Sequence, residues 1–123
     1  MQLLDSSIWL DHLAGTSEES SIIINNEDLL FCSILSIFEI KKKLIKLRFK
    51  GEKLDKSIEF VKQRALIINL NDTIINTAVE YSIKNNLSVV DSLIYATALE
   101  IEAQLITADN DFRNLENLRI IKK

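Results

Sequence analysis

Short apolar runs alternate with longer amphipathic segments along this chain. The runs are about four residues each, a length typical of strands buried on both faces and too short for ordinary helices. They are MQLL (1–4), LLFC (29–32), ALII (65–68), QLIT (104–107) and LRII (118–121). Helical spacing of apolar residues predicts helices over 34–50, 72–84 and 90–103, and the segment SSIWLDHL is also amphipathic. We expect Gly51 to end the first of these helices.

This alternation of strands and helices predicts an α/β fold. It favours a parallel sheet with helices on both faces, in which ligands bind at the carboxyl ends of the strands. A chain of 123 residues with 47% apolar content is large enough for one real core. There is no proline, no Gly/Ser linker and no internal repeat, so we expect a single domain over 1–123.

The composition argues against a membrane or secreted protein. No stretch approaches the roughly 18–20 uncharged apolar residues of a membrane helix, and the N-terminus lacks the basic residues and cleavage site of a signal peptide. The one cysteine, Cys32, lies within an apolar run, where we expect a buried, reduced thiol. We therefore expect a cytoplasmic protein without a membrane partner.

Charge is strongly segregated, although the net charge is only −3. Residues 41–64 hold ten of the fifteen Lys and Arg but three of the eighteen acids, a local charge of +7. The rest of the chain therefore carries −10. A basic segment within an acidic chain is either a solvated helix face or a surface for a polyanion.

Several acids fall at positions where an α/β fold would bring them together. Asp5 follows the first apolar run, and Asp109 and Asp111 follow the run at 104–107. Asp91 lies in the first turn of a predicted helix, and Glu39 lies early on the helix after the second run. We expect these carboxylates to converge at one edge of the sheet.

The helical register places Glu39 on the polar face of its helix. At about 100° per residue this face also carries Lys42, Lys43 and Lys46. The opposite, apolar face carries Ile37, Ile40, Leu44 and Leu47.

Each acid also has a simpler structural explanation. Asp5, Asp91, Asp109 and Asp111 all stand near predicted helix N-termini, where aspartate accepts backbone N–H bonds and meets the positive end of the dipole. Glu39 could pair with Lys43 four residues on, a contact worth a few tenths of a kcal/mol. Taken singly, capping explains each aspartate well.

The set as a whole resembles the PIN-domain nucleases, specifically the VapC-type toxins of bacterial toxin–antitoxin pairs. The resemblance rests on LLDSSIWLDHL, SILSIFEI, VVDSLIYATAL and LITADNDF, which occur in the order and at the separations usual for that family. It spans nearly the whole chain. It implies a three-layer α/β/α PIN-like fold with a central parallel sheet of about five strands, and an acidic pocket that binds Mg²⁺ or Mn²⁺ and hydrolyses RNA phosphodiesters.

The resemblance also assigns candidate roles to individual residues. Those matching the family's catalytic and metal-binding acids are Asp5, Glu39, Asp91 and Asp109. Those matching supporting positions are Asp111, a frequent fifth acid, and the hydroxyl residues Ser6 and Thr107. Ser7 departs from the family's common DTN form, in which many relatives carry Asn there. The family further implies a cognate antitoxin as partner and a homodimer.

Magnesium chemistry is consistent with this set, because Mg²⁺ prefers carboxylates, waters and phosphate oxygens as ligands. We expect Asp5 and Asp91 to hold the principal ion, with Glu39 and Asp109 orienting waters or completing a second site. The basic residues Lys42, Lys43 and Lys46 are favoured slightly as RNA backbone contacts over a solvated face.

Two further residues and two alternative functions were considered from the sequence. His12, the one histidine, is expected to be structural or exposed, and Trp9 to pack in the core or a dimer. A catalytically silent PIN scaffold that binds RNA or a protein remains an alternative. A phospho-acceptor receiver domain fits poorly. It needs paired acids after its first strand and a lone Asp after its third, whereas here Asp72 follows the third apolar run only after an Asn-rich turn.

Overall fold

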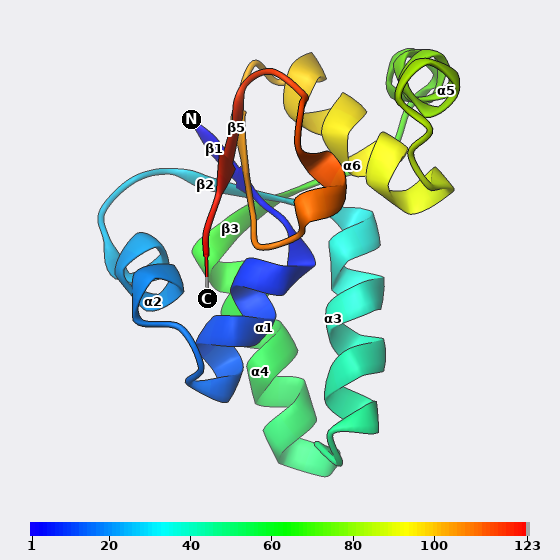
Figure 1. The fold of residues 1–123 in the computed structure, drawn as a ribbon. Coiled ribbons are helices and arrows are strands. Elements are labelled where there is room, and N and C mark those ends of the chain that lie inside the picture. Colours follow the sequence, from blue (N-terminus) through cyan, green and yellow to red (C-terminus); the bar gives the residue numbers. More distant parts are fainter. Residues whose placement is uncertain (123) are drawn as a thin grey trace.

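Five parallel strands form the central sheet of this protein (Figure 1). The computed structural model describes residues 1–122. The strands are β1 (Gln2–Leu4), β2 (Leu30–Ser33), β3 (Ala65–Ile68), β4 (Gln104–Thr107) and β5 (Leu118–Ile120). Their spatial order is β3-β2-β1-β4-β5, so β1 lies at the centre and the chain order reverses beside it. The five predicted strands and the parallel sheet are confirmed.

Helices cover both faces of the sheet and give the predicted α/β/α layering. They are α1 (Ser6–Ala14), α2 (Glu18–Asn25), α3 (Ile34–Lys46), α4 (Gly51–Arg64), α5 (Asp72–Asn85) and α6 (Val89–Glu100), with a short 3₁₀ helix, η1 (Asn110–Phe112). One apolar cluster joins α1–α4 to one face of the sheet. Two further clusters join α5, α6 and η1 to the other face.

Alternation along the strands explains how a sheet buried on both sides forms. Leu4 on β1 and Ile106 on β4 point toward α1–α4, whereas Leu3 and Leu105 point toward α6. All four side chains are fully buried. Such strands read as continuous apolar runs rather than alternating ones, which is the pattern in the sequence.

Polar caps define where most of the helices begin. Asp5, Ser17, Ser33, Asn71 and Ser88 each accept a backbone N–H bond at the N-terminus of a helix. Each cap satisfies a donor that the helix itself leaves free. Because several of these caps directly follow strands, the helix N-termini on both faces lie near the carboxyl edge of the sheet.

The prediction for residues 34–51 was wrong in one respect. The helix ends at Lys46, and Gly51 does not end it but begins α4. The chain reverses between them through Arg48, whose φ is +70°, and Gly51 itself has a φ of +57°. Leu47 therefore lies beyond the helix and is half exposed instead of joining the apolar face.

The helices of residues 1–122 include none that is both long and apolar enough to cross a membrane.

Candidate functional site

Asp5 is held by hydrogen bonds at the carboxyl end of the central strand. Its side chain is only 5% exposed. Oδ1 accepts the backbone N–H of Ser6 at 2.7 Å, and Oδ2 accepts the hydroxyl of Thr107 at 2.7 Å. The parallel register pairs Leu4 with Ile106, which brings the end of β4 beside Asp5. Sheet pairing thus fixes a carboxylate that is nearly removed from solvent.

Two hydroxyls connect Asp5 to the loop after β4. Ser7 Oγ lies 3.2 Å from Asp5 Oδ2, to which it donates, and it accepts the backbone N–H of Ala108 at 2.9 Å. Thr107 Oγ1 accepts the backbone N–H of Asp109 at 3.0 Å. These bonds position Asp109 relative to Asp5. Ser7 is a site residue to which the sequence assigned no role, because its contact with Ala108 depends on the pairing of β1 with β4.

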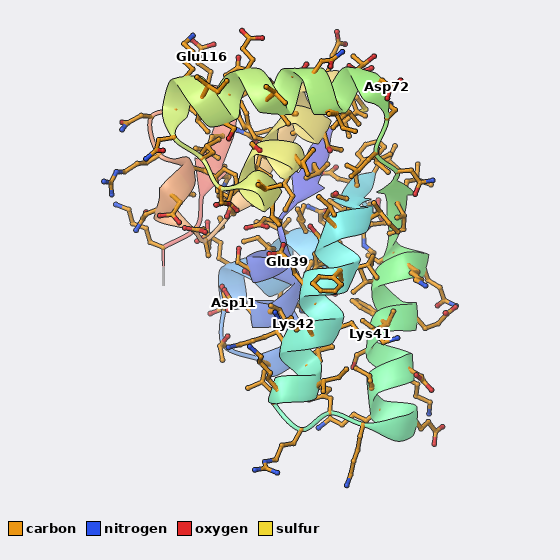
Figure 2. The ribbon with its side chains drawn as sticks, turned by 90° about the vertical axis from the view of Figure 1, so that its right-hand side faces the viewer. Asp11, Glu39, Lys41, Lys42, Asp72 and Glu116 are labelled. Carbon is orange, nitrogen blue, oxygen red and sulfur yellow. The ribbon has the colours of Figure 1, made fainter. Side chains whose placement is uncertain are left out.

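Glu39 reaches the same region from α3, which packs against α1. Figure 2 shows it high on α3, on the side toward α1. Ser6 Oγ donates to Glu39 Oε1 at 3.2 Å and lies 3.5 Å from Asp5 Oδ1, so Ser6 bridges the two acids. Among residues 1–122 no ion pair joins Glu39 to Lys43, so the pairing considered from the sequence is not present.

Asp91, Asp109 and Asp111 form the other side of the cluster. One carboxylate oxygen of each lies within 4.8 Å of the other two. Asp109 caps η1 by accepting the N–H of Asp111 at 2.8 Å. Asp91 caps nothing in this way, because Ser88 Oγ accepts the first-turn N–H of α6, which is that of Asp91 itself. The capping explanation therefore holds for Asp5 and Asp109 but not for Asp91.

The acids interact electrostatically as one group. Burial raises the pKa of Asp5, although the hydrogen bond from Thr107 opposes that rise. Burial, followed by the charge of Asp5, raises the pKa of Glu39. Burial, followed by the charges of Asp109 and Asp5, raises the pKa of Asp91 to about 6. The charge of each acid thus opposes ionisation of its neighbours, and a cation bound among them would relieve that repulsion.

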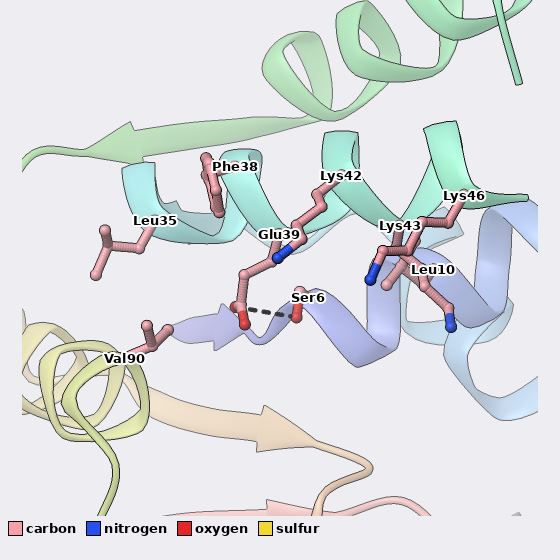
Figure 3. A pocket seen from close by; sticks show the side chains of 9 residues that line it. All are labelled: Ser6, Leu10, Leu35, Phe38, Glu39, Lys42, Lys43, Lys46 and Val90. Carbon is pink, nitrogen blue, oxygen red and sulfur yellow. Dashed lines mark hydrogen bonds between the residues drawn. The ribbon is translucent and has the colours of Figure 1, made fainter.

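A groove leads from Glu39 along α3 (Figure 3). Its volume is about 420 Å³. Its lining combines acidic, basic and apolar side chains: Ser6, Leu10, Leu35, Phe38, Glu39, Lys42, Lys43, Lys46 and Val90. The predicted face of α3 that carries Glu39 and three lysines is thus confirmed as a continuous surface.

The family model of the PIN domain matches residues 3–118 of this sequence. The chain belongs to the PIN domain family. No curated protein is similar enough in sequence to match it. The resemblance seen in the sequence motifs is thereby confirmed at the level of the family.

Solved structures share the fold of this PIN domain over nearly all its length. A toxin–antitoxin complex from Klebsiella pneumoniae has a TM-score of 0.84 at 20% identity, covering 100% of each chain. VapBC2 from Rickettsia felis, bound to promoter DNA, has a TM-score of 0.72 at 16% identity, and the match covers 98% of this chain and 97% of that chain. VapC20 from Mycobacterium tuberculosis, a toxin that cleaves the Sarcin-Ricin loop, has a TM-score of 0.70 at 14% identity, and the match covers 91% of this chain and 92% of that chain.

The donor set of this PIN domain fits a hard divalent cation. Asp91, Asp109 and Asp111 offer closely spaced carboxylate oxygens, and oxygen is the donor that Mg²⁺ and Mn²⁺ prefer. Of the four acids expected at the site, Asp91 and Asp109 belong to this group. Thr107 links Asp5 to the backbone of Asp109, and Ser6 links Asp5 to Glu39. Ser6, Thr107 and Asp111 lie there too, as hydrogen-bond partners or neighbours of those acids.

The remaining polar and aromatic candidates of the PIN domain are structural. His12 Nδ1 lies 2.8 Å from Ser21 Oγ, and its ring stacks on Phe60. Trp9 is fully buried in the core between the sheet and α1–α4. Cys32 is a buried free thiol, and burial raises its pKa to about 12, so it stays protonated.

Proposed function

We propose that this PIN domain is a metal-dependent ribonuclease that acts as the toxin of a toxin–antitoxin pair. The observation that carries the proposal is the convergence of Asp5, Glu39, Asp91 and Asp109, from four separate segments, with the pKa values of three of them raised together. Such a cluster is costly without a counter-ion. Fold similarity to a toxin that cleaves the Sarcin-Ricin loop supports the choice of RNA as substrate.

The proposed roles follow from the surroundings of each acid. Asp5 and Asp91 would hold the ion, Mg²⁺ or Mn²⁺, with Asp5 fixed in place by Thr107 and Ser6. Glu39 and Asp109 would orient waters, and Asp111 would support Asp109, whose side chain accepts its N–H. A bound divalent ion lowers the pKa of its water and neutralises charge gathering on a phosphate.

The lysines beside the acids are proposed to bind the RNA backbone. An acidic centre repels a polyanion, so nearby positive charge is needed to bring the substrate to it. Lys42, Lys43 and Lys46 line the groove that contains Glu39, which places positive charge beside the acidic cluster. They are the groups we propose to contact phosphates.

A protein partner is proposed on the same basis. Several solved neighbours are toxin–antitoxin complexes, so we propose a cognate antitoxin that inhibits this chain. We further propose a homodimer as its oligomeric state, from the family resemblance.

Cleavage of RNA by the purified protein tests the proposed activity. We expect cleavage with Mg²⁺ or Mn²⁺, none with EDTA, and a large loss in Asp91→Asn. Asp72→Asn is the matched control, since Asp72 is an exposed first-turn acid on α5, away from Glu39 (Figure 2). Cleavage undiminished by EDTA would exclude the metal mechanism. RNA binding without cleavage would favour the silent scaffold, and sequencing of RNA ends after brief induction would locate the cleaved site.

A further inference from the structure

Phe38 is an exposed aromatic residue directly beside the acidic cluster. It precedes Glu39 on α3, yet its side chain is 66% exposed. Figure 3 shows the two side chains leaving α3 in different directions, with Glu39 toward Ser6. A single exposed apolar residue is common on protein surfaces, so its exposure alone implies nothing. What singles it out is the set of side chains around it.

Phe38 forms part of a ridge between two hollows. With Lys42 and Lys46 it lines the groove that contains Glu39. With the same two lysines, and with Lys41 and Ile45, it also lines a neighbouring hollow of about 380 Å³. An apolar ring is thus surrounded by positively charged side chains on the same helix.

This chemistry favours a single-stranded nucleic acid as the occupant. Proteins that bind single-stranded nucleic acids without sequence preference use positively charged side chains along the phosphate backbone and aromatic rings on which the bases stack. Lys42 Nζ lies 6.0 Å from the centroid of Phe38, near the outer limit for a cation–π contact, so it is held weakly and can turn to a phosphate.

We propose that Phe38 is a base-stacking platform for an unpaired nucleotide of the RNA, next to the phosphate at the acidic site. This inference rests on the proposed function and adds to it a residue that positions the RNA, namely Phe38. A base within a duplex is already stacked on its neighbours, so its face is not free for the ring. Stacking on Phe38 therefore requires that the base at this position be unpaired.

Fluorescence of 2-aminopurine tests the stacking directly. The probes are a short labelled single-stranded RNA containing 2-aminopurine and the same strand in a duplex, both with the purified protein in EDTA to prevent cleavage. We expect the wild type to bind the single strand more tightly and to quench its fluorescence. Phe38→Ala should weaken single-strand binding by about 5- to 150-fold, the range for loss of one stacked base, and should abolish quenching.

Three further variants distinguish stacking from a general apolar contact. Phe38→Tyr should retain binding and quenching, because it keeps the ring, whereas Phe38→Leu should behave as Phe38→Ala. Ile83→Ala is the control for removing an exposed apolar side chain, since Ile83 is 79% exposed on α5. Full binding by Phe38→Leu, or unchanged binding by Phe38→Ala, overturns the proposal and leaves the ridge available to a protein.

The outcomes also separate this inference from the proposed function. Wild-type protein that quenches through Phe38 but cleaves no RNA with Mg²⁺ or Mn²⁺ supports the platform and refutes the nuclease. Wild-type protein that cleaves RNA, with Phe38→Ala equal to it in binding and cleavage, supports the nuclease and refutes the platform.

Discussion

The residue that best separates a cation site from ordinary helix capping is Asp91. Ser88 already provides the cap of α6, so the carboxylate of Asp91 is not needed to begin that helix. It lies instead near Asp109, Asp5 and Asp111; burial raises its pKa most, and the charges of these acids raise it further. A charge held among like charges destabilises the fold unless a cation compensates it.

Replacing Asp91 by Asn should therefore have opposite effects with and without metal. In EDTA we expect the melting temperature of Asp91→Asn to equal or exceed that of the wild type, because one repelling charge is removed. In Mg²⁺ at ten times Kd the wild type should gain about 1.4 kcal/mol, or about 3–6 °C, and the variant should lose most of that gain. Thermal unfolding in both buffers measures the difference.

Asp72→Asn is the matched control for this experiment. Asp72 is an exposed acid in the first turn of α5, so its replacement should shift the melting temperature by the same small amount in both buffers. Equal shifts for Asp91→Asn in EDTA and Mg²⁺ would mean that the acids do not form one cation site.

The pH dependence of stability in EDTA follows from the same residue. The pKa of Asp91 is raised from 3.8 to about 6 in the folded state, so the native protein holds this proton more tightly than the unfolded chain does. The resulting stabilisation is full below about pH 4 and is lost as the pH rises through about 6. Asp91→Asn lacks it. We expect the variant's melting temperature, relative to wild type, to rise between about pH 4 and 7, and a constant difference contradicts the assignment.

At the scale of elements, α3 carries an acidic site residue and several lysines on one surface. Its first turns place Glu39 at the acids, and its later turns place Lys42 and Lys46 along the groove (Figure 3). A helix is suited to this arrangement because residues three and four positions apart share a face.

Removing two lysines from α3 should weaken RNA binding mainly at low salt. For Lys42→Ala with Lys46→Ala, we expect the slope of log affinity against log salt to fall by roughly 0.7 for each phosphate that the protein no longer neutralises. Lys56→Ala with Lys62→Ala removes the same charge from exposed positions on α4, outside the groove, and should change the slope less. Titration of labelled RNA at several salt concentrations measures both. Equal slopes for the two double variants would mean that the lysines of α3 form a solvated surface and do not contact RNA phosphates.

The strands were predictable because a strand buried on both faces appears in the sequence as a continuous apolar run. ALII and QLIT coincide with β3 and β4, and the other three runs agree with their strands to within a residue at each end. The pattern assigned no helix to 51–64, because α4 fully buries only Val61 and begins without a side-chain cap. The turn before it depends on Arg48 at positive φ, a conformation that its residue type does not indicate.

The acids were predictable for a similar reason, whereas the hydroxyls that support them were less so. An acid after an apolar strand falls at the carboxyl edge of the sheet, which places Asp5 and Asp109. The contact of Ser7 with Ala108 depends on the register between β1 and β4, and spacing along the chain does not reveal that register. Nor does spacing show that Ser88 rather than Asp91 caps α6.

At the scale of the whole molecule, charge is divided between the acidic cluster and the basic groove beside it. An inhibitory antitoxin that inserts a basic side chain among the acids would take the place of the cation, through charge complementarity. We expect its inhibition of RNA cleavage to weaken as salt rises, and its affinity to fall in Asp91→Asn but not in Asp72→Asn. Binding measurements with the purified pair test this. A complex whose acidic cluster is open to solvent would contradict it.

The central place of β1 in the sheet also affects when the acidic cluster forms during folding. Asp5 and the hydroxyl that holds its carboxylate, on Thr107, lie 102 positions apart in the chain. A nascent chain that stops before β4 has β1 paired with β2 alone and lacks Asp109 altogether. Loop closure over such a separation comes late in folding. A chain shortened to end before β4 therefore cannot assemble the acidic cluster, because Asp5 then lacks both the hydroxyl that holds its carboxylate and the acid that follows β4.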